Sequence, residues 1–514
     1  MTTPAANLER LGAIDVGSNS IRLLVAEYDP ATGLQVIDEV KDMPRLATGV
    51  ASTGALDPLA MEHAFETLRR MKGVAERRGV TRLAAVATSA MRDASNGLAF
   101  AERIRRELAI PLEIIGEERE AQLSWRSVAH HFRLENARTL VADIGGGSLE
   151  LVGAVDGLVE VTTSLPLGAV RLTEAHLNGK KDARKAVTAL RKSVRSSLRK
   201  ALPWRDWVQA RLIGSGGSFT NLGRMAAARR GHLGEAVHGT TVNTGEVEAL
   251  LEWLATKTLA ERTQVPGLNP QRADIIIAGL AVTAELLAMV DARELTVSAY
   301  GLREGLLLEM VGASEQAKAA DPLKMIRDFV DRCRGDRRHV EQVRVLALAL
   351  HDQLAETLGC APEERWLLEA AALLHDVGQL VSYRKHHRHS FQLITHAERI
   401  GLGARERALV ALISRYHRKS GPSRKHEEFA RLSEEDQAIV RRVSGLLRLA
   451  DGLDRGHTAS VERITSTMLD DHLVVRAYPR LQGSDISLEV WGADRKSDVL
   501  AKALGCDVVV AAGM

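Results

Sequence analysis

The sequence predicts a multidomain α/β protein, in which two similar α/β halves are followed by a helical part and a small α+β unit. A strand–glycine turn–strand pattern occurs twice, at residues 11–25 (LGAIDVGSNSIRLLV) and 139–152 (TLVADIGGGSLELV). The two copies indicate two half-structures that face each other across a cleft. Beyond a linker-like stretch at residues 312–322, residues 323–457 show mostly the apolar periodicity of amphipathic helices.

Each copy of the repeated pattern has an aspartate at the end of a strand, then a tight turn and a second strand. The matched pairs are Asp15 and Asp143, Gly17 and Gly145, Ser20 and Ser148, and Leu23 and Leu151. Glycines let the backbone approach a ligand and turn several N–H groups toward phosphate oxygens. A single such turn is usually only a hairpin, and a dinucleotide site is disfavoured because a strand follows each turn. Two copies favour phosphate binding.

One matched position carries opposite charges in the two copies, Arg22 and Glu150. An arginine suits a phosphate oxygen, and a carboxylate suits a metal ion. A helix-like segment at residues 219–228 follows a third glycine turn, formed by Gly214, Ser215, Gly216 and Gly217. A helix N-terminus behind such a turn favours an anion or a nucleotide.

Local signals predict the other elements of the first half. Residues 36–40 continue the β pattern. Asp57 and Pro58 suit the N-cap and the first position of a helix. We expect this helix to bury an apolar stripe formed by Leu59, Phe65, Leu68 and Met71.

A buried strand at residues 82–87 leads to Arg92, and an arginine just past a strand end often points into a cleft, although a surface salt bridge is an equal alternative. Residues 96–108 are expected to be helical and residues 112–115 a short strand. The acidic residues of 116–123 suit a helix start.

Bulk composition narrows the function classes. Of 514 residues, 45% are hydrophobic and 26% are charged, as in folded globular proteins. Aromatic residues are only 4%, which argues against stacking platforms for single-stranded nucleic acid, so we expect no nucleic-acid partner. Because the net charge is only +3, any attraction for a polyanion must come from local basic patches.

The three cysteines, Cys333, Cys360 and Cys506, form no CxxC pair. This fits a reducing compartment and excludes a cysteine zinc site. An apolar signal core and an apolar run long enough for a bilayer are both absent from the sequence. We therefore expect a cytoplasmic protein without a membrane partner.

Six motifs together resemble the exopolyphosphatase/guanosine pentaphosphate phosphohydrolase family of the actin–Hsp70–sugar kinase superfamily. They are IDVGSNSIRLLV, ATSAMRDASN, GEEREAQLSW, VADIGGGSLELV, GSGGSFTNL and SAYGLREGLLLEM, in the order and spacing of that family. The resemblance covers nearly the whole chain. It implies two ribonuclease H-like domains (1–130 and 131–311) with a cleft between them, an all-α HD-like domain (323–457) and a small α+β domain (458–514).

The resemblance implies hydrolysis of a terminal phosphoanhydride, with Mg²⁺ or Mn²⁺ as the cofactor. It places the general base at Glu120, directly before the alanine of Glu-Ala-x-Leu, with Arg119 where the family commonly has a second acid. We assign the metal ion to Asp143 and Glu150. We assign phosphate binding to Asp15, Ser18, Asn19, Arg22, Arg92, Gly145, Gly146, Gly147, Ser148, Gly214, Ser215, Gly216 and Gly217.

Three functions fit these residues. The first is an exopolyphosphatase that shortens inorganic polyphosphate from its end. The rest of a long polyphosphate would then lie on the basic runs of the helical part. The second is a pppGpp 5′-phosphohydrolase that gives ppGpp. The third is a non-enzymatic regulator that binds polyphosphate or nucleotide, and the intact Glu120, Asp143 and Glu150 argue against it. A kinase of the same superfamily is a weaker alternative because no sugar-binding signature is evident.

The helical part carries a His–Asp pair at the end of an apolar helix, which places two metal ligands at one spot. The H…HD…D pattern of HD phosphohydrolases is matched by His339, His375, Asp376 and Asp451. His389 and His417 suit a second metal ion. Gln379 departs from the pattern, because active HD enzymes often carry lysine there. Relatives commonly use this domain for substrate binding and dimerisation, so we expect a homodimer and favour a non-catalytic domain. Whether this domain binds an additional divalent metal stays open.

Overall fold

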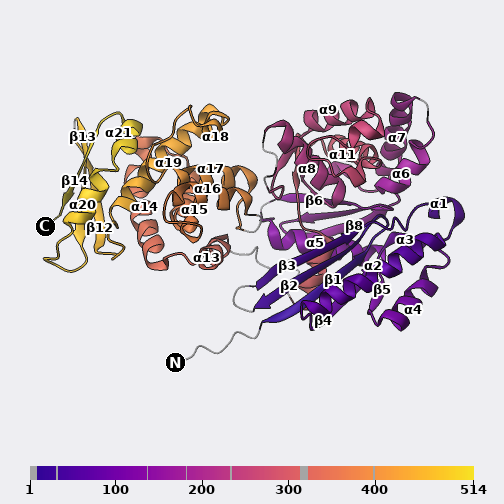
Figure 1. Cartoon of the computed structure of the whole chain (residues 1–514). Coiled ribbons are helices and arrows are strands. Elements are labelled where there is room, and N and C mark those ends of the chain that lie inside the picture. The colour runs from indigo at the N-terminus through magenta and orange to yellow at the C-terminus, as the bar shows by residue number, and fades with distance from the viewer. Residues whose placement is uncertain are drawn as a thin grey trace. The chain divides into compact units, whose positions relative to one another are not determined.

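The computed structural model (Figure 1) describes residues 8–29, 33–135, 137–180, 182–231, 234, 236–312, 322–397, 400–469 and 471–513. The chain divides into two compact units, residues 1–320 and 321–514. The linker predicted at residues 312–322 falls almost entirely outside the described residues. None of the described helices combines the length and the apolar character that a membrane crossing requires.

The first unit contains two mixed sheets with the same core topology. In the first sheet the order is β3-β2-β1-β4-β5, and only β2 runs antiparallel to the others. Its strands are β1 (Glu9–Val16), β2 (Ile21–Asp29), β3 (Gly33–Asp42), β4 (Arg82–Ala87) and β5 (Leu112–Ile114). The helices of this half are α1 (Val50–Thr53), α2 (Pro58–Arg77), α3 (Ser89–Asp93), α4 (Gly97–Leu108) and α5 (Glu117–His131).

The second sheet repeats this order as β8-β7-β6-β9-β11 and adds β10 antiparallel to β11. Its strands are β6 (Arg138–Ile144), β7 (Leu149–Val155), β8 (Leu158–Leu165), β9 (Arg211–Ser215), β10 (Thr241–Asn243) and β11 (Glu294–Val297). The helices are α6 (Ala169–His176), α7 (Ala183–Leu198), η1 (Trp204–Trp207), α8 (Gly217–Arg229), α9 (Thr244–Ala255), α10 (Leu259–Arg262), η2 (Pro270–Arg272), α11 (Ile276–Val290) and α12 (Leu302–Met310).

Alternation along β1 separates two cores. Ile14 and Val16 pack with α2 and α4, whereas Leu11 and Ala13 face α5 and α12. The cap of α2 is confirmed, since the Asp57 carboxylate accepts the N–H groups of two residues in its first turn. The stripe prediction was wrong at one position: Leu59 is 82% exposed, because it lies in that first turn, whereas the other three stripe residues are buried.

Helices α5 and α12 pack against each other and cross the division between the two halves. Helix α5 follows the last strand of the first sheet in sequence, yet Trp125 and Val128 pack on Val141 and Val152 of the second sheet. Helix α12 follows the second sheet, yet Leu306 and Leu307 belong to the core beneath β1. The exchange brings the start of each helix to the strand ends of both sheets.

The second unit is a helical bundle that carries a small sheet of order β12-β13-β14 (Figure 1). Its helices are α13 (Pro322–Arg332), α14 (Arg337–Leu358), α15 (Pro362–Leu374), η3 (Val377–Leu380), α16 (His386–His396), α17 (Ala404–Arg415), α18 (Glu427–Ala430), α19 (Glu434–Gly452), α20 (Ser487–Asp494) and α21 (Asp498–Leu504). Its strands are β12 (Val461–Met468), β13 (His472–Pro479) and β14 (Asp507–Ala512). One apolar core joins the bundle to the sheet.

The close contact of α5 and α12 predicts a sharp difference between two glycine substitutions. A β-carbon on Gly305 would lie 1.9 Å from the carbonyl oxygen of Leu123. We expect Gly305→Ala to lower the free energy of unfolding by about 1–3 kcal/mol, because the helices must move apart.

Gly73→Ala is the matched control, since its β-carbon would meet only the end of the Arg77 side chain at 3.6 Å. We expect it to raise the free energy of unfolding by roughly 0.5–1 kcal/mol, as alanine usually does inside a helix. Urea unfolding measures both changes. Equal stability of Gly305→Ala and the unaltered protein would contradict the helix contact.

Candidate active site

The acidic residues of the two hairpins converge because of strand geometry. Asp15 follows Ala13 by two positions on β1, so it shares the face that Ala13 turns toward α5 and α12. Asp143 likewise follows Val141, whose side chain packs on α5. Glu150 stands directly opposite Asp143 in the β6–β7 ladder and therefore shares its face. All three acids face the first turn of α5, which carries Glu120.

The backbone of the second glycine turn is oriented by helix α6. The N–H groups of Gly168, Ala169 and Val170 donate to the carbonyl oxygens of Gly147, Gly145 and Gly146, at 3.2, 3.0 and 2.9 Å. In a planar trans peptide the N–H points opposite to the carbonyl. The N–H groups of Gly146, Gly147 and Ser148 therefore point away from α6. The N–H of Gly145 closes the turn instead, because it donates to the Ser148 carbonyl at 3.0 Å.

The first turn repeats this construction. The N–H of Gly17 donates to the Ser20 carbonyl at 3.1 Å, and the carbonyls of Ser18 and Asn19 accept the N–H groups of Ala47 and Arg45 at 2.8 and 3.3 Å. The N–H groups of Asn19 and Ser20 thus point the other way. The two turns also touch, since a β-carbon on Gly146 would lie 2.7 Å from the β-carbon of Ser18.

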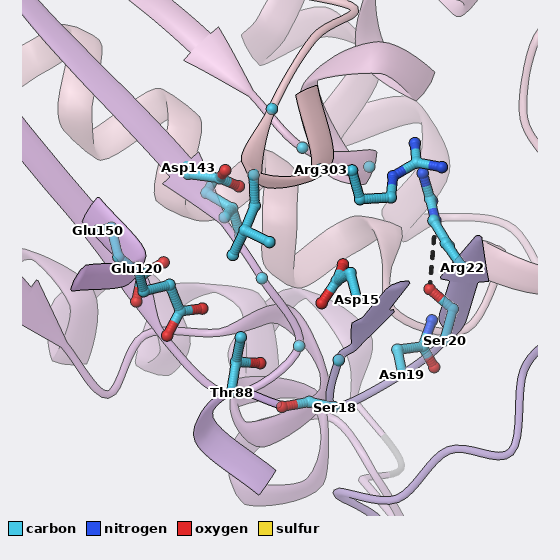
Figure 2. A pocket seen from close by; sticks show the side chains of 18 of the residues that line it. Asp15, Ser18, Asn19, Ser20, Arg22, Thr88, Glu120, Asp143, Glu150 and Arg303 are labelled. Atoms are coloured by element: carbon cyan, nitrogen blue, oxygen red, sulfur yellow. Dashed lines mark hydrogen bonds between the residues drawn. The ribbon is translucent and has the colours of Figure 1, made fainter. Parts of the chain in front are cut away.

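One cavity lies between these turns, α5 and the start of α12 (Figure 2). Of the predicted residues, those that line it are Asp15, Ser18, Asn19, Arg22, Glu120, Asp143, Gly145, Gly146, Gly147, Ser148, Glu150, Gly216 and Gly217. The structure places Gly214 and Ser215 outside this lining, where Ser215 donates its hydroxyl to Asp143 at 3.2 Å. Ser124 Oγ donates to the same carboxylate oxygen at 2.9 Å.

Burial raises the pKa values of the acids that line the cavity. The pKa of Asp15 rises to about 6 despite the opposing effect of Arg303 and Arg22. Burial also raises the pKa of Asp143 and, together with the neighbouring Glu120, raises that of Glu150 well above its usual range. Carboxylates placed so close together in a buried site attract cations.

Glu120 is held by Arg92, which is outside the cavity lining. The Arg92 Nη1 atom donates to Glu120 Oε2 at 3.0 Å and to the carbonyl of Ile115 at 2.9 Å. Burial raises the pKa of Glu120 to about 7, while Arg92 opposes that rise. Arg92 therefore orients a carboxylate in this structure, and the phosphate contact expected for it from the sequence stays a prediction.

Two arginines of the cavity were missed in the sequence. Arg303 belongs to the first turn of α12 and follows the end of β11. A position just past a strand end is the same sequence signal that selected Arg92. Arg272 is 5% exposed, and its Nε atom has no hydrogen-bond partner among the described residues. Its guanidinium lies against Gly217 at the N-terminus of α8. Burial, and then the nearby Arg22, lower the pKa of Arg272 to about 10.

Figure 2 shows that the cavity is polarised. Glu120 and Glu150 lie on one side, Arg22 and Arg303 lie on the other, and Asp15 lies between them. Lys41 stands near the arginine side, where burial and then Arg22 lower its pKa to about 8. Cations crowded in this way attract anions, although Arg303 is already paired with Glu39 at 2.8 Å.

In the second unit, the four residues predicted to bind a metal come together. His339 Nε2 lies 3.3 Å from His375 Nε2, 3.8 Å from Asp376 and 3.6 Å from Asp451. The pairing of His389 with His417 was wrong, because His386 is the residue that joins Asp376 and His417. Helix α16 begins at His386, so His389 lies almost one turn further along.

The chain is similar to known proteins over most of its length. Residues 24–314 match the model of the Ppx/GppA phosphatase family, and residues 324–478 match its domain III. Exopolyphosphatase 1 of Mycobacterium tuberculosis is 29% identical over 326 residues, covering 60% of this chain and 90% of that protein. The guanosine-5′-triphosphate,3′-diphosphate pyrophosphatase of Vibrio vulnificus is 26% identical over 507 residues, covering 96% and 98%.

Solved structures are similar to more than half of the chain. The Ppx/GppA family member of Aquifex aeolicus has a TM-score of 0.51 and 30% identity, and the match covers 59% of this chain and 98% of that one. An exopolyphosphatase of Cytophaga hutchinsonii has a TM-score of 0.54 and 25% identity, covering 60% and 99%. The family match spans more than half of the sequence, and its second part continues into the helical unit. The chain therefore belongs to the Ppx/GppA phosphatase family.

Proposed function

We propose that this protein is an exopolyphosphatase, which hydrolyses the terminal phosphoanhydride of inorganic polyphosphate and releases orthophosphate. The observation that carries the proposal is the polarity of the cavity (Figure 2). Carboxylates occupy one side, arginines occupy the other, and two glycine turns join them. A phosphate chain fits this arrangement when its end lies beside the carboxylates and its body lies on the arginines.

The substrate's phosphates are held by backbone and by guanidinium groups. The N–H groups of Asn19, Ser20, Gly146, Gly147 and Ser148 supply fixed donors from the two turns. Arg22, Arg272 and Arg303 supply charge-assisted hydrogen bonds, which are stronger than neutral ones. The unpaired Nε of Arg272 is a donor that an oxyanion satisfies.

Glu120 accepts the proton of the attacking water. A base works best when its pKa lies near the operating pH, and burial places the pKa of Glu120 at about 7. Arg92 keeps this carboxylate in place and favours its ionised form. Phosphoryl transfer needs mainly such alignment, together with neutralisation of charge on the transferred group.

Magnesium fits the acidic side of the cavity. The donors there are buried carboxylate oxygens with raised pKa values, and oxygen-only sites suit Mg²⁺ or Mn²⁺. Asp143 and Glu150 would hold the ion, with Ser124 and Ser215 fixing the Asp143 carboxylate. When bound, the ion would neutralise charge on the phosphoryl oxygens.

We also assign both sheets of the first unit to the ribonuclease H-like fold. The shared strand order, with one antiparallel strand in the same place, supports this assignment. The matched turns at Ser18 and Gly146 support an origin by duplication.

The alternative substrate is pppGpp, because the relatives include proteins named for each activity. The cations around Lys41 and Arg272 favour an extended phosphate chain. Initial rates of phosphate release from long-chain polyphosphate and from pppGpp, measured side by side with Mg²⁺, separate the two. We expect the higher kcat/KM for polyphosphate. A higher value for pppGpp would reverse the assignment, and no release from either would favour a binding regulator.

Replacing the base should abolish turnover without abolishing binding. We expect Glu120→Gln to lower kcat by about 10²–10⁴-fold, because the water loses its proton acceptor. Polyphosphate affinity, measured by filter binding, should stay close to normal. Glu118→Gln is the control, since Glu118 is an exposed residue of the same helical turn. Near-normal turnover in Glu120→Gln would remove this residue from the role.

The acid side of the pH profile should move when Arg92 is replaced. Glu120 is active when ionised, so kcat/KM should fall as the pH drops below the pKa of this residue. Arg92 opposes the rise of that pKa, so Arg92→Gln should raise it and move the fall to higher pH. A phosphate-binding role for Arg92 predicts a raised KM with an unchanged profile. The pH dependence of both constants distinguishes the two roles.

A further inference from the structure

Six side chains of the second unit converge on one buried cluster, apart from the polarised cavity. They are His339, His375, Asp376, His386, His417 and Asp451. Five separate stretches of the chain supply them: the first turn of α14, the link between α15 and η3, the start of α16, the segment just after α17, and the end of α19. So many segments meeting at one point argue for a built site.

The first group has the spacing of ligands around one ion. His375 Nε2 lies 3.3 Å from His339 Nε2, 3.8 Å from Asp376 Oδ1 and 3.9 Å from Asp451 Oδ1. His339 Nε2 lies 3.6 Å from Asp451 Oδ1. Donors bound at about 2.1 Å to one tetrahedral or octahedral ion lie roughly 3.0–3.4 Å apart. The observed spacing is slightly wider than that.

The second group shares Asp376 with the first. His386 Nε2 lies 3.2 Å from Asp376 Oδ1, and His417 Nε2 lies 3.6 Å from the same oxygen. The two Nε2 atoms are 3.0 Å apart. One carboxylate therefore stands between two pairs of imidazoles.

The other ring nitrogen of each histidine is already bound to an acceptor. His339 Nδ1 donates to Asp454 at 2.8 Å, and His375 Nδ1 donates to the Ala372 carbonyl at 2.8 Å. The remaining pair does the same: His386 Nδ1 donates to the Tyr383 carbonyl at 3.0 Å, and His417 Nδ1 to the Ser414 carbonyl at 2.6 Å. In the neutral ring this leaves the Nε2 lone pair free, so four lone pairs point inward. Metal-binding histidines are held in this way.

Bound protons are the alternative to metal ions between His339 and His375 and between His386 and His417. A proton bridges two donor atoms, whereas the first group offers four donors and the second offers three. A metal ion binds that number of donors, and imidazoles with carboxylates suit first-row transition metals better than Mg²⁺. The donor count therefore favours metal ions.

The departure at Gln379 does not weaken the cluster. Its side-chain amide donates to Asp376 Oδ2 and so fixes the shared carboxylate. A lysine reaches the cluster from another element, because Lys496, between α20 and α21, pairs with Asp451. Two divalent ions would exceed the charge of Asp376 and Asp451, and Lys496 adds to the excess. A bound anion would offset this excess of positive charge.

We propose that this cluster is a dinuclear centre for divalent transition-metal ions, with Asp376 as the shared ligand and a phosphate-type anion as the external ligand. Such a pair of ions binds phosphoryl oxygens from both sides. The centre uses no residue of the polarised cavity, so it stands or falls separately from the exopolyphosphatase assignment.

Cobalt binding to the full-length protein tests the proposal. After removal of metal with a chelator and addition of excess Mg²⁺ to fill the carboxylate site of the cavity, we expect about two imidazole-bound Co²⁺ per chain, counted from their visible d–d absorption bands. His417→Gln should lose about half of this metal, and Asp376→Asn should lose most of it. His389→Gln is the matched control on α16 and should keep it. Glu150→Gln should also keep it, which separates this centre from the cavity of the first unit.

Inorganic phosphate should shift the absorption bands of the cobalt-loaded protein. An unaltered spectrum would contradict the proposal that a phosphate-type anion binds the metal ions. Absence of cobalt bands in the unaltered protein would overturn the metal centre, without reliance on any variant. Equal cobalt loss in His389→Gln and His417→Gln, or loss in Glu150→Gln, would also overturn it. Circular dichroism checks that each variant is folded.

Discussion

Burial of several carboxylates around one cavity is the constraint on which the first unit depends. Asp15, Glu120, Asp143 and Glu150 each have a raised pKa, with burial as the largest cause. Unpaired charges in such a place cost several kcal/mol each unless cations or hydrogen bonds offset them. The arginines on the far side of the cavity and the serines on Asp143 meet part of that requirement, and the proposed metal ion would meet the rest. An anionic substrate then balances the arginines.

The two turns solve a second problem, which is how to present donors without long side chains. In each turn the carbonyls are tied to a neighbouring segment, residues 45–47 in the first copy and the start of α6 in the second. Their N–H groups are thereby fixed in the opposite direction. Fixed donors need no reorganisation when charge develops, which is the main advantage of a preorganised site.

Sequence patterns predicted the features that are local in the chain. The Asp15 and Asp143 hairpins, the cap at Asp57 and the glycine turns are all set by neighbours a few residues away. Arg272 gave no such signal, because its place against Gly217 depends on how η2 packs on α8. The choice of His386 over His389 depended on where α16 begins, and helix boundaries are the least reliable part of sequence interpretation. The role of Arg92 required the distance to Glu120, which only the fold supplies.

The exchange of α5 and α12 between the sheets has a consequence for how the two halves fold. A chain cut between β5 and β6 would leave one fragment with α5 exposing Trp125 and Val128, and the other with β6 and β7 uncovered. Neither fragment would have a complete apolar interior, so each would need the other as a template. The two halves of the first unit are therefore expected to unfold together as one cooperative body.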